Sequence, residues 1–187
     1  AGALVTIVLN LFSVPLLTYM YGTANASKFI VLMAPFFILL HIQAPLQAAL
    51  QALDFAKYAM WNSLIGAACK LSILFMLASN PNYGIIGVAI AMSVGVVLVT
   101  LLHLATLNKL IQFSIPFKDI SKMITLLIIT STLGYFLRMF FIYIDGSIIH
   151  FIIILVLLTI IYIIFLFLLK FITKEELKQL PFFQKWV

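Results

Sequence analysis

Hydrophobic residues occur along this chain in six continuous runs of about 20 residues, the length that a helix needs to cross the hydrocarbon core of a bilayer. Within the runs, polar and apolar residues do not alternate as they do in the strands of a membrane barrel. The pattern therefore predicts an all-α, polytopic transmembrane bundle. Its six helices are expected over residues 3–21, 29–53, 58–79, 84–107, 120–143 and 148–171.

The short segments between the runs contain Gly, Asn, Asp and Pro, the residues that favour turns. We expect residues 1–118 to form a four-helix portion of a transporter half-bundle, and residues 119–172 to add two helices. Residues 173–187 are expected to form a cytoplasmic tail. Thr173 and Glu176 there have the spacing of a helix capping box, so the tail is either a short interfacial helix or disordered.

The composition excludes a soluble domain. Hydrophobic residues make up 65% of the 187 residues and charged residues only 9%, whereas soluble domains carry roughly 25% charged residues. The net charge of +6 does not indicate a nucleic-acid partner, because most of the basic residues flank apolar runs. Cys69 is the single cysteine and forms no internal disulfide.

The basic residues also predict the orientation in the membrane, since cytoplasmic loops carry an excess of Lys and Arg. One side of the predicted bundle has only Lys28 and Arg138. The other side has Lys57, Lys109, Lys118, Lys122, Lys170, Lys174, Lys178 and Lys185. We therefore expect both ends of the chain to lie in the cytoplasm. The chain begins without Met or a leader sequence, and we interpret it as a piece whose N-terminus lies upstream.

Lys70 is the most informative single residue. It lies about 12 residues into the third predicted helix, roughly 18 Å along its axis, where neither membrane interface is near. A charge at that depth costs about 2.5–3.5 kcal/mol on insertion scales, so it usually has a function. Asn62 and Gly66 precede it by eight and four residues and share its side of the helix. This stripe predicts either a cationic point in a cavity for an anionic headgroup or a structural pair with another part of the protein.

The second predicted helix carries a row of glutamines at a spacing of four, Gln43, Gln47 and Gln51. The row either lines a cavity that accepts sugars or joins helices by hydrogen bonds. Pro35 and Pro45 lie in the same helix and each removes a backbone donor, so they are candidates for kinks or hinges.

Small residues at every fourth position predict a close helix contact in the fourth helix, at Gly87, Ala91 and Gly95. His41 and His103 also lie in apolar helices, where a lone histidine more often packs than carries protons. The sixth predicted helix is apolar all round and should face lipid over much of its surface.

Motifs for catalysis or metal binding are missing from the sequence. The five acidic residues all lie at helix ends or in the tail, and no His, Cys and Asp cluster has the spacing of a metal site. We therefore predict no catalytic residue, metal or cofactor.

Several segments resemble the polysaccharide-export family of the MOP flippase superfamily and in particular its sporulation branch. They are residues 43–53, 56–62, 66–71, 77–81, 84–91 and 99–103. The likeness is good over residues 15–118, whereas the last two helices match only in hydrophobicity. Ala52 stands where many family members have Gly, which weakens any expectation of a sharp bend there.

The resemblance implies a bacterial cytoplasmic-membrane protein of about fourteen helices in two halves, of which this chain would be the last six. It implies a partner half in the same chain and a lipid-linked saccharide as substrate, with Lys70 and the region from Gln47 to Gln51 facing a central cavity. The leading hypothesis is a flippase that works by alternating access. The alternatives are a cation-coupled multidrug exporter, a membrane enzyme acting on polyprenyl phosphates, and a scaffold that transports nothing.

Overall fold

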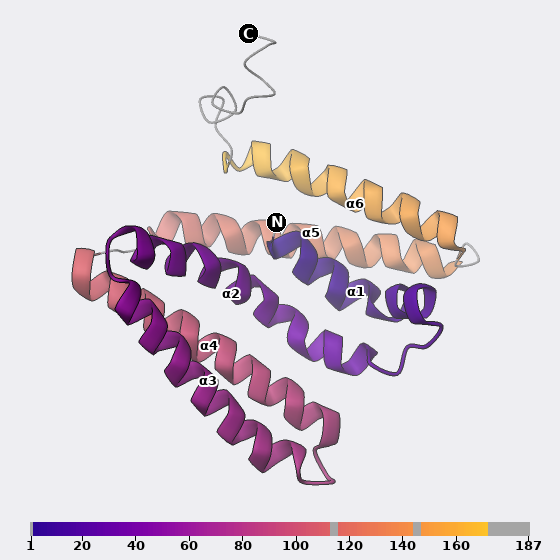
Figure 1. Cartoon of the computed structure of the whole chain (residues 1–187). Coiled ribbons are helices and arrows are strands. Elements are labelled where there is room, and N and C mark those ends of the chain that lie inside the picture. Colours follow the sequence, from indigo (N-terminus) through magenta and orange to yellow (C-terminus); the bar gives the residue numbers. More distant parts are fainter. Residues whose placement is uncertain (1, 113–115, 144–146, 172–187) are drawn as a thin grey trace. The chain divides into compact units, whose positions relative to one another are not determined.

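The computed structural model describes residues 2–112, 116–143 and 147–171, and within these ranges it contains six α-helices and no strand (Figure 1). The helices are α1 (Gly2–Tyr21), α2 (Ser27–Ala52), α3 (Ala56–Ala78), α4 (Gly84–Ile111), α5 (Phe117–Tyr143) and α6 (Ile148–Leu168). Each has a stretch long and apolar enough to cross a membrane. The prediction of an all-α bundle with six membrane-spanning helices is confirmed. The tail 173–187, with its predicted capping box, lies outside the described residues.

The helix ends follow local chemistry. At the start of α6, the hydroxyl of Ser147 accepts a hydrogen bond from the backbone N–H of His150 and so caps the helix. The α2–α3 turn passes through Asp54 at φ 64°, a left-handed conformation that Asp tolerates better than most residues. Helix α4 continues four residues past its predicted end and stops at Gln112, which also adopts a left-handed conformation.

Helix α1 departs from helical geometry at Phe12, where φ is −118° and ψ is 18°. Pro15 explains this kink, because it has no N–H and its ring clashes with the carbonyl of Leu11. Our sequence analysis did not single out Pro15. It named Pro35 and Pro45, which both lie inside the continuous helix α2. Their role as hinges stays a prediction.

The chain divides into two compact units, Ala1–Ile115 and Pro116–Val187. In the first unit α2 is central, since it packs against α1, α3 and α4, while α3 and α4 also pack against each other. In the second unit α5 packs against α6. Helix α6 buries a stripe at helical spacing, Phe151, Ile154, Leu158 and Tyr162, and leaves most of its other apolar side chains exposed. Such exposure fits a helix whose solvent is lipid.

The first unit has an apolar cluster near the α2–α3 turn. Leu46 and Leu50 of α2, Ala59 of α3 and Leu107 of α4 are all buried and pack together. All four lie between the middle of the bundle and the turn at Asp54. The cluster therefore closes one end of the space between the three helices.

Candidate functional site

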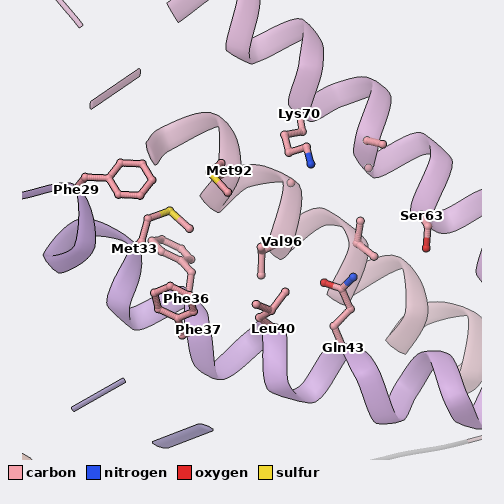
Figure 2. Close-up of a pocket in the computed structure, with 14 residues that line it drawn as sticks. Phe29, Met33, Phe36, Phe37, Leu40, Gln43, Ser63, Lys70, Met92 and Val96 are labelled. Carbon is pink, nitrogen blue, oxygen red and sulfur yellow. The ribbon is translucent and has the colours of Figure 1, made fainter. Parts of the chain in front are cut away.

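A cavity of about 330 Å³ lies between α2, α3 and α4 (Figure 2). Helix α2 contributes the largest share of its wall, and α3 and α4 contribute four residues each. Its lining is Phe29, Met33, Phe36, Phe37, Leu40, Gln43, Ser63, Gly66, Ala67, Lys70, Met92, Gly95, Val96 and Val99. The volume falls at the lower end of the range typical of small-molecule sites.

The lining is divided by chemistry. Its polar side chains are Gln43, Ser63 and Lys70, and in Figure 2 the ammonium of Lys70 points into the space that Gln43 also faces. Three phenylalanines and two methionines line the other part, Phe29, Phe36, Phe37, Met33 and Met92. A cavity of this kind suits an amphipathic molecule, with its charged group near Lys70 and its apolar part against the aromatic side chains.

Lys70 is held in place by close contact between its methylene groups and α4. A Cβ atom added to Gly95 would lie 3.0 Å from Lys70 Cβ and 3.1 Å from its Cδ. The glycine therefore gives the lysine stem room to run along α4 and to present its ammonium to the cavity. Among the described residues, no acidic side chain forms a salt bridge with Lys70. The ion pair that the described residues do contain joins Lys122 and Asp119 of α5.

Gln43 is the second polar group of the cavity. Its Oε1 atom is buried and has no hydrogen-bond partner within the described parts of the chain. A buried acceptor without a partner costs about 1–3 kcal/mol, and a ligand donor or a water molecule at this point would remove that cost. The other two glutamines of the predicted row do not line this cavity. Gln47 is half-buried and Gln51 is exposed.

Asn62, the other predicted cavity residue, lies elsewhere. It is buried between α3 and α4, where its Nδ2 donates to Thr106 Oγ1 at 2.9 Å and lies 3.2 Å from His103 Nδ1. His103 is fully buried, and its Nε2 has no partner among the described residues. The structure thus brings Asn62 into a polar link between helices. The sequence offered one signal for that link, the polar pair His103 and Thr106 one helical turn apart.

The predicted small-residue seam of α4 is buried along its length, at Gly87, Ala91 and Gly95. A Cβ atom on Gly87 would lie 2.8 Å from the backbone carbonyl carbon of Leu77 in α3. On α3, a Cβ atom on Gly66 would collide with the Cγ2 atom of Val99. The missing side chains therefore let α3 and α4 approach each other beside the cavity.

No family model matches the chain, and no solved structure matches it. Two curated proteins of Bacillus subtilis (strain 168) are similar to the chain. Stage V sporulation protein B is 38% identical over 181 residues, which are 97% of this chain and 35% of that protein. Sporulation protein YkvU is 30% identical over 104 residues, 56% of this chain and 23% of that protein. The chain thus spans about a third of the length of the first relative.

The first match reaches further than we expected from the sequence. We expected a good likeness over residues 15–118, with the last two helices similar only in hydrophobicity. An alignment over 97% of the chain includes those helices as well.

Proposed function

Because the chain belongs to the stage V sporulation protein B-like family of MOP flippases, we propose that it forms part of a flippase for a lipid-linked oligosaccharide. The substrate would be a precursor of peptidoglycan or of another polysaccharide, moved across the bacterial cytoplasmic membrane by alternating access. No bond would be made or broken. A second half-bundle, supplied by the same protein, would form the opposite wall of the transport path.

The observation that carries this proposal is the cationic group in the cavity. Lys70 lies in a membrane-spanning helix, lines the cavity, and has no acidic partner among the described residues. A phosphate or pyrophosphate is the kind of group that such a lysine binds as a point charge. The amide of Gln43, with its free carbonyl oxygen, would accept a hydrogen bond from a sugar hydroxyl.

The same charge argues against the runner-up, a cation-coupled multidrug exporter. Two like unit charges about 6 Å apart repel each other by roughly 3 kcal/mol at an effective dielectric constant near 20. A cationic drug in the cavity would therefore bind about a hundredfold more weakly beside Lys70 than beside a neutral side chain. The binding of an anionic amphiphile would be strengthened by the same amount, and the aromatic part of the lining would hold its apolar portion.

The apolar cluster at the α2–α3 turn supports the interpretation that the observed conformation is closed toward the cytoplasm. By the excess of lysines on that side, the turn near Lys57 is expected to face the cytoplasm. The buried residues Leu46, Leu50 and Leu107 would then separate the cavity from the cytoplasm. Separation of the Leu46 and Leu50 side chains of α2 from Leu107 of α4 is the step that would open the cavity to that side.

The test is transbilayer movement of a labelled lipid-linked saccharide in liposomes that contain the full transporter. We expect Lys70→Gln to slow movement at least tenfold and Lys70→Arg, which keeps the charge, to retain more of it. Lys28→Gln is the matched control, because it removes the same charge from an exposed position at the start of α2. Equal rates in the Lys70→Gln and Lys28→Gln proteins, at equal thermal stability, would exclude Lys70 from transport. Absence of movement in the intact protein would overturn the flippase proposal.

A further inference from the structure

The polar link between α3 and α4 consists of three groups that can each donate or accept a hydrogen bond. They are the amide of Asn62, the imidazole of His103 and the hydroxyl of Thr106. Thr106 donates to the carbonyl of Leu102 at 2.7 Å, so its oxygen accepts from Asn62 Nδ2. The second N–H of that amide then points to His103 Nδ1. In this arrangement Nδ1 is the acceptor and His103 is neutral, with its proton on Nε2.

The link can also hold a protonated His103 if every hydrogen bond in it reverses. A proton taken from water would occupy the lone pair of Nδ1 and face the amide N–H of Asn62. Rotation of that amide by half a turn would present Oδ1, which accepts from Nδ1–H. The hydroxyl of Thr106 would then turn from the Leu102 carbonyl and donate to the same Oδ1 atom. No new partner is needed at Nδ1, and no acidic side chain is required.

We propose that Asn62, His103 and Thr106 form a proton-binding site between α3 and α4, in which the Asn62 amide rotates as His103 gains or loses its proton. The site is distinct from the cavity, whose lining includes none of the three residues. It goes beyond the proposed transport function and depends on it only for the coupling described below. A lone histidine in an apolar helix more often packs than carries protons, but His103 has two polar partners that can accommodate a proton, Asn62 and Thr106.

The surroundings of His103 decide when the proton binds. Helices α2 and α3 are the ones that pack against α4, and none of their ionisable side chains is hydrogen-bonded to His103 among the described residues. The ionisable side chains on these helices and their joining turns are Lys28, His41, Asp54, Lys57, Tyr58, Cys69, Lys70, Tyr83 and Lys109. Nε2 has no hydrogen-bond partner among the described residues. A conformation that brings water to Nε2 would therefore bind the proton more tightly than the packed one.

Lys70 links the proton site to the cavity by charge. It follows Asn62 by eight residues on α3 and touches Gly95, which precedes His103 by eight residues on α4. Eight residues along either helix correspond to about 12 Å, which is therefore the approximate distance between Lys70 and the proton site. At an effective dielectric constant near 20, the Lys70 charge disfavours protonation about tenfold at that distance. An anion bound at Lys70 would cancel this effect, so anion and proton would favour each other's binding.

The test follows the imidazole signals of the whole chain in lipid nanodiscs by long-range ¹H–¹⁵N NMR between pH 8.5 and 5. His41→Gln and His150→Gln variants assign the signals. We expect His103 to carry its proton on Nε2 at high pH and to become protonated within this range. Asn62→Leu should lower the midpoint by about one pH unit or more, and the nearly isosteric Thr106→Val should lower it less. Ser72→Ala, on an exposed part of α3, is the control and should leave it unchanged.

Each outcome bears on one part of the proposal. A His103 that stays neutral down to pH 5 overturns the proton site, as does a midpoint that is the same in all variants. Farnesyl pyrophosphate is the probe for coupling, and its binding is measured separately by isothermal titration calorimetry. If it binds and raises the midpoint by about one unit, the coupling holds. If it binds without moving the midpoint, the coupling is wrong. If it does not bind while His103 still titrates, the proposed anion site fails and the proton site stands.

Discussion

Lys70 of α3 lies directly against Gly95 of α4, so that a Cβ atom on the glycine would be 3.0 Å from Lys70 Cβ and 3.2 Å from Lys70 Cγ. A cation inside a membrane bundle is thus positioned by an absent side chain on the neighbouring helix. The contact joins two residues that the sequence marks for separate reasons, one as a buried charge and one as part of a packing seam. Substitution of either should affect the other.

Gly95→Ala is expected to change function more than stability. The added methyl group lies 3.0 Å from Lys70 Cβ, so α3 has to shift by a few tenths of an ångström while the outer atoms of the lysine stem turn aside. Alanine also gains about 1 kcal/mol of helix propensity over glycine. We expect the melting temperature in detergent to change little, while transport falls several-fold because the ammonium moves. Gly95→Val should lower both. A large loss of stability in Gly95→Ala would show that α3 and α4 cannot adjust at this point.

Gly66→Ala should destabilise the protein, by about 1–3 kcal/mol, because its methyl group collides with Val99. A β-branched side chain has few rotamers in a helix and cannot turn away. Val99→Ala removes the colliding atom, so the double variant should recover most of the loss. Thermal unfolding of the four proteins in a double-mutant cycle measures this coupling. Purely additive effects would contradict the contact.

Gly87→Ala is expected to be the most damaging of the three glycine substitutions. Its methyl group would meet the backbone of Leu77, with the carbonyl oxygen 2.9 Å away, and backbone atoms cannot rotate aside. The helices would have to separate. Gly22→Ala is the comparison, since a Cβ atom there meets nothing within 4 Å and only its φ of 70° opposes the change, at about 1–2 kcal/mol. Similar melting temperatures for the two variants would contradict this ranking.

Asn62→Leu should cost little stability despite the loss of two buried hydrogen bonds. Measured hydrogen bonds between membrane helices average about 0.6 kcal/mol, because the unfolded chain in lipid also finds partners. We expect a loss of roughly 1 kcal/mol in SDS-induced unfolding, well below that of Gly87→Ala. A loss of several kcal/mol would show that the link has mainly a structural role.

Lys70 should react with a small, water-soluble amine reagent and should be protected by an anionic amphiphile. Its ammonium faces the cavity and has no acidic partner among the described residues. Mass spectrometry of the modified chain with and without farnesyl pyrophosphate measures the protection, and exposed Lys28 is the internal control. Protection of Lys70 by a cationic amphiphile instead would favour the drug-exporter alternative.

Much of the fold could be predicted from the sequence because in lipid the backbone has to satisfy its own hydrogen bonds. Apolar runs of the right length therefore determine helices, and the six predicted helices agree with the observed ones to within a few residues. The cost of a buried charge marked Lys70, and the spacing of Gly87 and Gly95 marked a seam. These features depend on neighbours along the chain or on burial alone, so they are visible without a structure.

The tertiary structure decided which of the polar residues meet. Asn62 and Lys70 share one side of α3, yet α4 covers the first with His103 and Thr106 and leaves the second in the cavity. Of the glutamine row, Gln43 lines the cavity and Gln51 is exposed. Helical spacing determines which side chains share a face, but the positions of the neighbouring helices determine what that face contacts. Those positions depend on residues such as Gly66 and Gly95, which act by the space they leave.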